Sequence, residues 1–381
     1  GPRYRLKMWS QWIVSGDTSR RVNHSGRHPS KGLVIRTLKD GYWDRTEVIE
    51  LPEGGRRVRK RTKGAAFGPW GVESLRREIR YLASLPERTA AVFPPVLAAW
   101  DDESGAAPDV GYEMPFYADH IDAGELARCG TLAQDEIDGF QDALADALFD
   151  RLHEPLAAEE SLAGHVSSVV GQAWRALEKD PALSVLIHAT DIELNGGRVL
   201  GPRTAFERIR SETGALSALD AGPCVRLHGD LFLENILWRR AEAVPTGDAP
   251  RLILVDPVSV AGVMCGPPVF DVVKYVSYAT GELLALRSEW VEVDEHEAAG
   301  CQGYVFRIRW EDTALQPFRT RDWHSRFLRA FEARRGPVDR RLYQLIDGYF
   351  SAAMAVNTRG TQRRARLLKA TASFNAVLNQ C

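Results

Sequence analysis

The order in which strand-like and helix-like patterns follow one another is the feature of this sequence that most restricts its fold. Up to residue 115, short apolar-rich runs are separated by glycine-bearing turns such as Asp40-Gly41, a pattern typical of β-hairpins. The predicted strands are residues 33–38, 46–51, 56–62, 96–100 and 110–114. Between the third and the fourth, residues 72–85 place Leu75 and Leu82 at helical spacing and end at Pro86, which predicts one helix.

The rest of the chain has mainly helical patterns. A long amphipathic helix is expected over residues 132–153, and two or three helices within residues 154–220. The later predicted elements are a helix at 269–288, an inserted hairpin at 289–310 and helices from 322 onwards. The sequence therefore predicts an α+β fold with two lobes, a small antiparallel-sheet lobe with one helix and a larger, mainly helical lobe. The expected boundaries are an extension at 1–30, the N-terminal lobe at 31–115 and the C-terminal lobe at 116–381.

Composition narrows the class of protein. The 381 residues carry a formal net charge of −2, which gives no electrostatic reason to expect nucleic acid or a membrane surface as a partner. No apolar run approaches the ~18 residues that a membrane span needs. The five cysteines are widely scattered, without the spacing of metal ligands or of a disulfide framework, as expected for a protein of the reducing cytoplasm.

The strongest chemical signal is the segment His228-Gly229-Asp230, with Asn235 five residues after the aspartate. A second acid, Asp256, comes directly after the apolar run 252–255, which predicts a buried strand that ends at a carboxylate. Transfer of a phosphoryl group requires an oriented nucleophile and neutralisation of the charge on the phosphate oxygens. One aspartate can align a hydroxyl and accept its proton, while an amide and a second carboxylate can hold Mg²⁺. This set therefore predicts a phosphotransferase centre.

The motif His-Gly-Asp-x-x-x-x-Asn, followed by a strand-borne Asp, resembles the aminoglycoside phosphotransferase and choline kinase superfamily, which has a protein-kinase-like fold. The resemblance implies that Asp230 is the catalytic base and that Asn235 and Asp256 bind Mg²⁺. The segment 266–274 also resembles the family's Gly-x-Pro…Asp-Leu segment, in which Asp271 is expected to have a structural role.

The resemblance also implies residues that contact the nucleotide. It places Lys60, on the third predicted strand, at the α- and β-phosphates, and Glu78, on the following helix, as the acid that pairs with this lysine. Several other basic residues surround Lys60, so a solvated basic strand is the alternative interpretation. Lys63 is the second candidate for the phosphate contact.

The phosphate-covering turn and the base-binding strand are less distinctive. The turn at Gly41 is expected to cover the phosphates, although it has a single glycine instead of a glycine-rich run. The adenine base is expected beside Met114 and Phe116, where backbone groups would read it. Pro257 stands where protein kinases have a Phe-Gly pair, and a proline there disfavours a mobile activation segment.

Two expectations concern the catalytic loop itself. His228 is expected to hold the loop by hydrogen bonds and not to take part in the chemistry. No lysine or arginine stands between Asp230 and Asn235, so Lys60 and bound Mg²⁺ are expected to neutralise most of the phosphate charge.

The sequence does not single out one acceptor. The acceptor cleft is expected between the helices of 154–220 and those of 322–380, which contain both arginines and acids. The acids suited to a cationic acceptor are Glu159, Glu160, Asp191 and Glu193. The leading hypothesis is a kinase that uses ATP and Mg²⁺ to phosphorylate a hydroxyl of a small molecule, such as an antibiotic, a sugar or an amino alcohol. GTP as donor, a peptide serine or threonine as acceptor, and a pseudokinase scaffold are the open alternatives, and the oligomeric state is also open.

Overall fold

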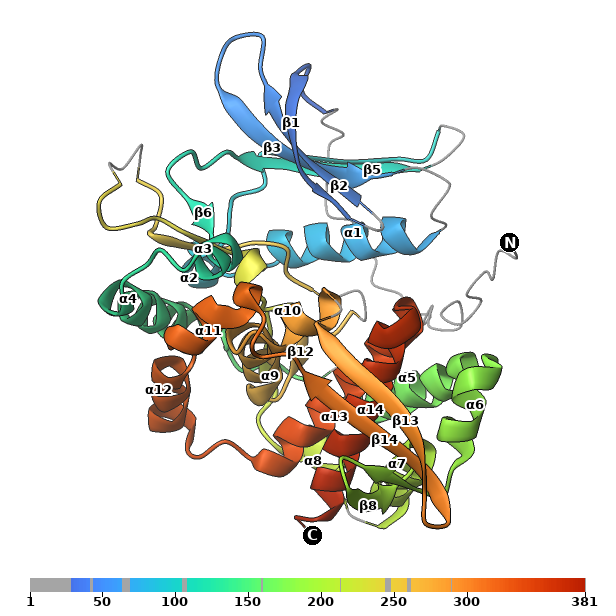
Figure 1. Cartoon of the computed structure of the whole chain (residues 1–381). Coiled ribbons are helices and arrows are strands. Elements are labelled where there is room, and N and C mark those ends of the chain that lie inside the picture. Colours follow the sequence, from blue (N-terminus) through green and yellow to red (C-terminus); the bar gives the residue numbers. More distant parts are fainter. Residues whose placement is uncertain are drawn as a thin grey trace.

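The computed structural model describes residues 29–41, 44–63, 69–104, 108–158, 160–212, 214–243, 248–258, 262–288 and 290–380. Most of the predicted extension at 1–30 lies outside this part of the chain, as do Glu159 and two residues of the predicted phosphate-covering turn, Tyr42 and Trp43. Figure 1 shows a sheet with one helix above a larger, mainly helical part. The predicted α+β architecture, with a small antiparallel-sheet lobe and a larger, mainly helical lobe, is confirmed.

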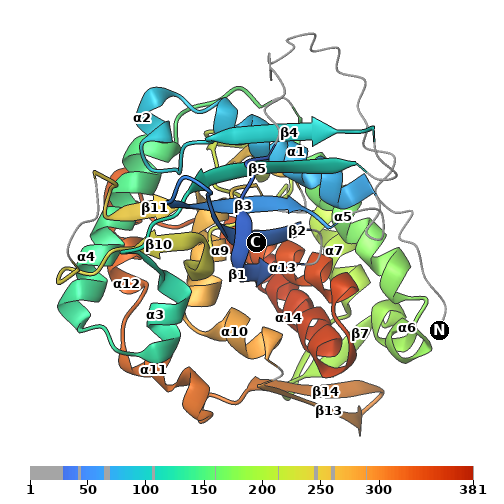
Figure 2. The ribbon, with the colours of Figure 1, turned by 90° about the horizontal axis from the view of Figure 1, so that it is seen from above.

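The small lobe is a five-stranded antiparallel sheet with a single long helix. In chain order its strands are β1 (Leu33–Asp40), β2 (Asp44–Glu50), β3 (Arg56–Thr62), β4 (Ala98–Asp102) and β5 (Asp109–Pro115). In space they run β1-β2-β3-β5-β4, and Figure 2 shows the last four side by side. The helix α1 (Pro69–Ala83) packs its buried Leu75 and Ile79 against this sheet. The predicted order of strands and helix is confirmed.

A buried carboxylate organises the face of the sheet that points away from α1. Glu113 on β5 has an exposed fraction of 0% and forms ion pairs with Arg59 at 2.9 Å and Arg57 at 3.2 Å on the neighbouring β3. Ser30 adds two hydrogen bonds to the same carboxylate, from its backbone N–H and its hydroxyl. Because side chains alternate along a strand, Arg59 serves this face while the next residue, Lys60, points to the α1 face.

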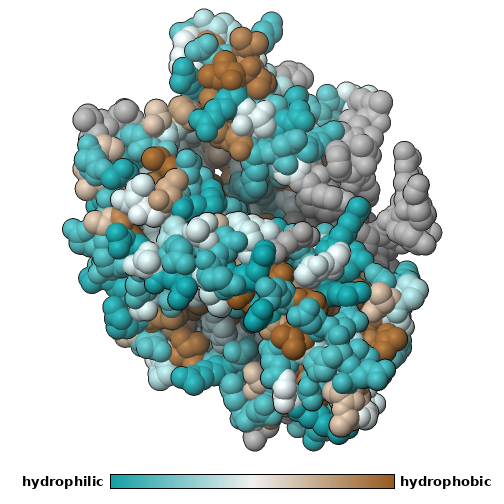
Figure 3. Space-filling view, viewed as in Figure 1, coloured by the Kyte–Doolittle hydropathy of each residue, from teal (hydrophilic) through white to brown (hydrophobic). Residues whose placement is uncertain are grey.

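The strand β1 forms an exposed edge of the small lobe. It pairs with β2 and has no neighbour on its other side within the described residues. Four apolar side chains on it are exposed: Leu33, Val34, Ile35 and Leu38. Figure 3 shows apolar groups at the upper end of the molecule, where β1 lies. The pairing register shifts between Thr37 and Lys39, and because such irregularities re-aim a side chain, Lys39 can reach towards the large lobe.

The large lobe contains most of the helices. They are α2 (Glu87–Ala90), α3 (Ala123–Cys129), α4 (Gln134–Ala145), α5 (Leu162–Leu177), α6 (Pro181–His188), α7 (Pro202–Glu212), α8 (Ala218–Ala221), α9 (Val269–Ala279), α10 (Glu282–Arg287), α11 (Gln316–Thr320), α12 (Ser325–Arg335), α13 (Arg340–Asn357) and α14 (Gly360–Leu378). One hydrophobic cluster runs from Val58 in the sheet to Phe374 in α14, so the two lobes share a continuous core.

Two helices differ from the sequence prediction in ways that affect the site. The helix expected over 132–153 ends in a π-helical segment, Asp146–Leu152, after which the buried His153 enters the core. The helix expected over 269–288 breaks at Gly281, whose φ is 84°. Since this left-handed conformation suits glycine best, the chain turns there, and α10 takes a separate position from α9.

Short strands carry the loops that matter for chemistry. β9 (Val225–Arg226) pairs with β12 (Cys265–Gly266), and β10 (Ile236–Trp238) lies between β6 (Ile121–Asp122) and β11 (Leu252–Leu254). The catalytic-loop motif occupies the connection between β9 and β10. The predicted buried strand before Asp256 is confirmed, since all three residues of β11 are buried.

A four-stranded sheet lies at the far end of the large lobe. The predicted inserted hairpin is confirmed as β13 (Val291–Ala298) and β14 (Cys301–Ile308), and it joins a hairpin that the sequence analysis missed, β7 (Asp191–Leu194) with β8 (Gly197–Leu200). β14 pairs in parallel with β7. Two of the acids expected at the acceptor cleft are instead paired within this sheet region, Asp191 with Arg198 and Glu193 with His296.

No helix in the described part of the chain is long and apolar enough to cross a membrane.

A half-buried histidine in the large lobe predicts how the free energy of unfolding depends on pH. On α5, His165 places Nε2 3.1 Å from the hydroxyl of Tyr349 on α13. Burial, with a smaller effect from Arg77, lowers the pKa of His165 to about 4. The unfolded chain therefore takes up this proton first, at about pH 6.5, and the free energy of unfolding should fall as the pH drops from 6.5 towards 4. The full effect of this one group is about 3 kcal/mol.

Denaturant unfolding of the wild type and of His165→Gln, followed from pH 7 to pH 4, measures this dependence. The wild-type free energy of unfolding should fall more steeply than that of the variant. Parallel curves would show that His165 is not the group responsible.

Candidate active site

A buried aspartate fixes the start of the catalytic loop. Both oxygens of Asp271, on α9, accept backbone hydrogen bonds at 2.9 Å, Oδ2 from His228 N–H and Oδ1 from Gly229 N–H. His153 Nε2 lies 3.0 Å from Oδ2, and these contacts hold the pKa of the Asp271 carboxyl below its ordinary value in spite of burial. Gly229 has a φ of 81°, the left-handed region that favours glycine. Asp271 thus contacts the backbone of the loop, and the structural role expected for it stays a prediction.

His228 connects this loop to the segment that carries Asp256. Its Nε2 lies 3.0 Å from the carbonyl oxygen of Val255, and its own carbonyl accepts a 2.7 Å hydrogen bond from Val258 N–H. The turn between them is strained, because Asp256 has φ 52° and Val258 has φ 67°, values that are rare for residues with a side chain. Such strain persists only where the surroundings enforce it, and His228 supplies that enforcement at both ends of the turn.

Asp230 and Asn235 lie in direct contact. The amide nitrogen of Asn235 donates to the backbone carbonyl of Asp230 at 2.8 Å and to its Oδ2 at 3.3 Å. The backbone carbonyl of Asn235 accepts a 2.9 Å hydrogen bond from Val255 N–H. Because the amide nitrogen faces Asp230, the amide oxygen is the atom that can serve as a metal ligand. The loop therefore brings the predicted base and both predicted metal ligands together.

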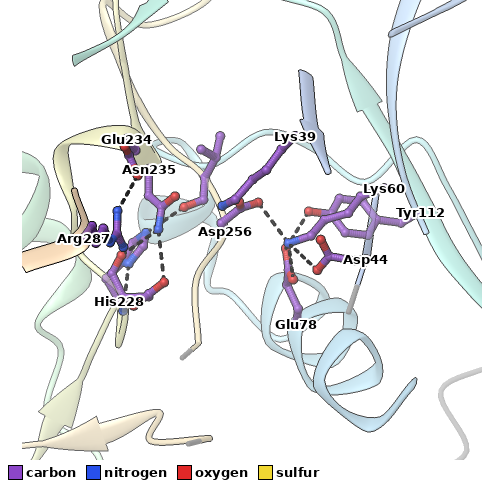
Figure 4. Close-up of polar contacts among 12 residues, drawn as sticks. Lys39, Asp44, Lys60, Glu78, Tyr112, His228, Glu234, Asn235, Asp256 and Arg287 are labelled. Carbon is purple, nitrogen blue, oxygen red and sulfur yellow. Dashed lines mark hydrogen bonds and ion pairs between the residues drawn. The ribbon is translucent and has the colours of Figure 1, made fainter. Parts of the chain in front are cut away.

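Lys60 lies at the centre of a buried ionic network between the lobes. Its ammonium nitrogen is 2.7 and 2.9 Å from the two carboxylate oxygens of Glu78 on α1 and 3.0 Å from Oδ1 of Asp256 (Figure 4). Asp44 lies 3.7 Å away, and the Tyr112 hydroxyl donates to Glu78 at 2.7 Å. Burial opposes the charge on Lys60, but the three carboxylates together raise its pKa well above the ordinary value. The pairing predicted for Lys60 and Glu78 is present.

Lys39 is a member of this network that the sequence analysis missed. From β1 its ammonium nitrogen reaches 2.9 Å from Oδ2 of Asp256 (Figure 4). The charge of Asp256 is the main reason that the pKa of Lys39 is raised. The two lysines together hold the pKa of the buried Asp256 carboxyl far below its ordinary value. No local pattern marks Lys39, because its partner is 217 residues away in the sequence.

Lys274 supplies the cation that the catalytic loop lacks. Its ammonium nitrogen, projecting from α9, lies 3.1 Å from Oδ1 of Asp230 and 4.0 and 4.6 Å from the ring centres of Phe350 and Phe232. The side chain is buried, and burial lowers the pKa of its ammonium group. Lys274 is thus a further cation at this centre, which the sequence did not single out; the expectation that Lys60 and the metal neutralise most of the phosphate charge stays a prediction. Lys274 stands three residues after Asp271 in the segment 266–274, which was its only sequence signal.

Glu234, inside the loop, is held by two arginines and a tyrosine. Its Oε1 lies 3.0 Å from a guanidinium nitrogen of Arg128 and accepts a 2.8 Å hydrogen bond from the Tyr278 hydroxyl, and its Oε2 lies 2.8 Å from Arg287. These partners keep the pKa of Glu234 below its ordinary value in spite of burial. The residue thus anchors the loop to α3, α9 and α10.

The remaining predicted positions lie around this centre. Gly41 ends β1, and its carbonyl accepts a 2.7 Å hydrogen bond from Lys63, which also pairs with Asp40. Lys63 thus contacts the turn, while Lys60 contacts Glu78 and Asp256. Met114 is buried on β5 and Phe116 follows that strand, half-buried. Nothing in these contacts tests the roles predicted for Gly41, Met114 and Phe116.

The oxygen atoms at the centre of the site fit Mg²⁺. Asn235 offers an amide oxygen and Asp256 a carboxylate, the hard ligands that this cation prefers. Two ammonium groups already contact the Asp256 carboxylate, so this position attracts positive charge. Among the described residues there is no cluster of three or more His, Cys, Asp or Glu side chains able to hold a metal. Mg²⁺ in nucleotide sites is bound through one or two carboxylates together with phosphates and water, so a larger cluster is not required.

Comparison with known proteins places the resemblance at the level of the fold. No protein-family model matches the sequence, and no curated protein matches it significantly. Among solved structures, the chain is similar to a glucosamine kinase in complex with glucosamine, ADP and inorganic phosphate, with 15% identity over 97% of this chain and 99% of the other and a TM-score of 0.37. An aminoglycoside phosphotransferase from Alicyclobacillus acidocaldarius has 12% identity over 91% and 92% of the two chains, with a TM-score of 0.42.

A choline kinase from Cryptosporidium parvum has 13% identity over 92% of this chain and 88% of the other, with a TM-score of 0.40. At these identities the likeness is one of overall architecture. Conclusions about function therefore depend on the residues of the site described above.

The contact between Lys274 and Asp230 predicts a loss of turnover when the lysine is removed. Lys274→Met should lower kcat by about 100-fold, the effect typical of losing one charge-stabilising donor, while the KM for the nucleotide changes little. Lys274→Arg should restore part of kcat, because the guanidinium keeps the charge beside Asp230. Steady-state kinetics of both variants measure this split, with exposed Lys179→Met as the matched control. An unchanged kcat in Lys274→Met would contradict the assignment.

Proposed function

We propose that this protein is an O-phosphotransferase that moves the γ-phosphate of ATP onto a hydroxyl of a small molecule. The observation that carries this proposal is the meeting of Asp230, Asn235, Asp256 and Lys60 from distant parts of the sequence. A base, two oxygen ligands and a buried ammonium group are the minimum that phosphoryl transfer requires.

Asp230 would orient the acceptor hydroxyl and accept its proton as the oxygen attacks phosphorus. Lys274 holds the Oδ1 oxygen of this carboxylate and Asn235 contacts the Oδ2 oxygen, so the side chain has a fixed direction before the acceptor binds. Holding the carboxylate in one orientation lowers the entropic cost of reaching the reactive geometry. The same lysine would also bring positive charge close to the transferred group.

Lys60 and Lys39 would bind the nucleotide phosphates from the small lobe. Both ammonium groups already face the Asp256 carboxylate, which places them at the junction where the phosphates would lie. Glu78 keeps Lys60 extended from β3. Asn235 and Asp256 would hold Mg²⁺, and the chemistry that this ion supplies is neutralisation of charge on the phosphate oxygens.

The proposal also names a nucleotide donor and a type of acceptor, and each has one alternative. ATP is the proposed donor, with GTP as the competing nucleotide in the same assay. A small-molecule hydroxyl is the proposed acceptor, and a peptide hydroxyl is the alternative. Mass spectrometry of acceptor mixtures after incubation with each nucleotide, read as the gain of one phosphoryl group, separates these forms.

Replacing the proposed base should remove turnover and leave nucleotide binding in place. Asp230→Asn keeps the size of the side chain but cannot accept the proton, so kcat should fall by about 10²- to 10⁴-fold. The Kd for ATP with Mg²⁺ should stay within a few-fold of the wild-type value. Asp294→Asn, an exposed change on β13, is the matched control. Wild-type turnover in Asp230→Asn would rule out the base assignment.

Replacing Asp256, the proposed metal ligand that follows β11, should weaken nucleotide binding, whereas replacing Asp230 should not. Asp256→Asn should weaken Mg²⁺-dependent ATP binding by about 100-fold, the upper range for losing one partner of a metal site. Isothermal titration calorimetry with Mg²⁺ and with excess EDTA measures this loss. Chelation should weaken ATP binding in the wild type much more than in the variant. Equal sensitivity of the two proteins to EDTA would contradict the role of Asp256.

A further inference from the structure

Two cationic side chains, Lys274 and Arg287, lie beside Asp230 and Phe232, and a third cation, Arg366, lies close to Arg287. Lys274 contacts the Oδ1 oxygen of Asp230, whereas Asn235 contacts Oδ2, so the carboxylate separates Lys274 from the proposed metal side. Arg287, at the end of α10, places its guanidinium 5.0 Å from the ring centre of Phe232, the ring that Lys274 also contacts. The third cation, Arg366, comes from α14.

The position of Arg366 follows from the packing of α14 on α10. Gln362, one helical turn before Arg366, donates a 2.8 Å hydrogen bond to the carbonyl of Arg287. Lys369, three residues after Arg366, pairs with Glu282 at the start of α10 and with Asp347 on α13. Residues three and four apart share one face of a helix, so Arg366 lies on the face of α14 that is directed towards α10.

Arg366 forms no ion pair among the described residues, unlike the cations around it, and the acid that acts on it, Glu282, is already paired with Lys369. Lys274 is paired with Asp230, Arg287 with Glu234, and Lys369 with two carboxylates. Arg363 and Arg364, its neighbours in sequence, are paired with Asp180 at 3.6 Å and Glu295 at 2.6 Å.

Arg366 itself is only 3% exposed, and its Nε has no hydrogen-bond partner within the part of the chain that the structure describes. Burial lowers the pKa of this guanidinium to about 10; Arg287 nearby acts in the same direction, and Glu282 acts in the opposite one. A buried charge without a partner destabilises a fold. A side chain that bears this cost is therefore a candidate for binding an anion that arrives from outside.

We infer that the hydroxyl compound phosphorylated at this site carries an oxyanion, a carboxylate or a phosphate or sulfate ester, and that Arg366 and Arg287 bind it. The inference rests on the proposed phosphotransferase function and names the chemical class of its acceptor. A planar guanidinium binds such groups through two parallel hydrogen bonds. The nucleotide phosphates are accounted for separately, because Lys39 and Lys60 face the other side of Asp230, at Asp256.

The oxyanion takes no part in the bond changes. The acceptor oxygen forms a bond to the γ-phosphorus of ATP, the bond between that phosphorus and the β–γ bridging oxygen breaks, and ADP leaves. The hydroxyl proton passes to Asp230. The anionic group holds the acceptor so that its hydroxyl lies beside this carboxylate.

A binding experiment tests the inference without knowledge of the natural acceptor. Calorimetry and thermal shift measure the binding of sodium sulfate and sodium gluconate, with choline chloride at equal ionic strength as the comparison. The proteins are the wild type, Arg366→Met and Arg366→Lys. The control variant is Arg208→Met, because Arg208 lies on the exposed face of α7. Sulfate and gluconate should stabilise the wild type and the control. Their affinity should fall about 10- to 100-fold in Arg366→Met, the effect of one hydrogen-bonded charge. Equal affinity in the wild type and Arg366→Met would overturn the inference.

The stability of the variants provides a second readout. Arg366→Met removes an unpaired buried charge and should keep or raise the Tm. If this variant fails to fold, the test uses Arg366→Lys, which keeps the charge. A several-fold weaker affinity of Arg366→Lys for sulfate supports oxyanion binding, and an unchanged affinity overturns it.

A transfer experiment separates failure of the inference from failure of the proposed function. Glucose, glucosamine, gluconate and glucose 6-phosphate present similar hydroxyls with neutral, cationic, carboxylate and phosphate character. The inference expects the highest kcat/KM among the two anionic compounds, with loss of that preference in Arg366→Met. Preference for glucosamine or glucose would overturn the inference while the phosphotransferase function stands. If the protein neither binds ATP nor transfers phosphate to any acceptor, the proposed function fails, and sulfate binding still decides the role of Arg366.

Discussion

The contact of Asp256 with two lysines is the interaction on which the rest of the site depends. Lys39 and Lys60 come from different strands of the small lobe, and the carboxylate comes from the large lobe. Lys39 is half exposed, whereas Lys60 is buried. The pair of Lys60 with Asp256 is therefore the costly one to break, because a single remaining charge would be left without compensation. This pair links the small lobe to the large one. The strained turn beneath it, held by His228, keeps the carboxylate from moving away.

The parts of this structure that could be predicted from sequence are those in which the signal is local. The hairpins of the small lobe, α1 and the loop from His228 to Asn235 each have their determinants within a few residues, so spacing alone revealed them. The break at Gly281 and the hairpin of β7 and β8 were missed although both have local signals, Gly281 itself and the turn Asn195-Gly196 between two alternating runs. The helical patterns on either side were extended through these glycines. The pairing of Lys60 with Glu78 was expected only through family resemblance.

The site residues that the sequence did not reveal are all cations, and they share one physical reason. Lys39 and Lys274 pair with acids on distant elements, and Arg366 is buried by the packing of α14 on α10. A lysine or arginine in a helix or an edge strand is ordinarily a solvated surface residue, so the sequence does not mark them. A cation is absent from the loop between Asp230 and Asn235, yet α9 delivers one to the same carboxylate. A cation at such a centre must lie close to the carboxylate, but it can come from any element that reaches this point. The two sides of Asp230 consequently differ, with amide contact on one and cations on the other.

The parallel pairing of β14 with β7 has a consequence for how this chain folds. The paired residues Gly303 and Glu193 are more than a hundred positions apart, so the four-stranded sheet cannot close until most of the large lobe has been synthesised. Contacts of such long range slow folding. Until β14 arrives, β7 presents an open edge, and open edges are where chains associate wrongly. The inserted hairpin therefore covers the open edge of β7 only late in synthesis. Until then, this edge is a site at which unfinished chains can aggregate.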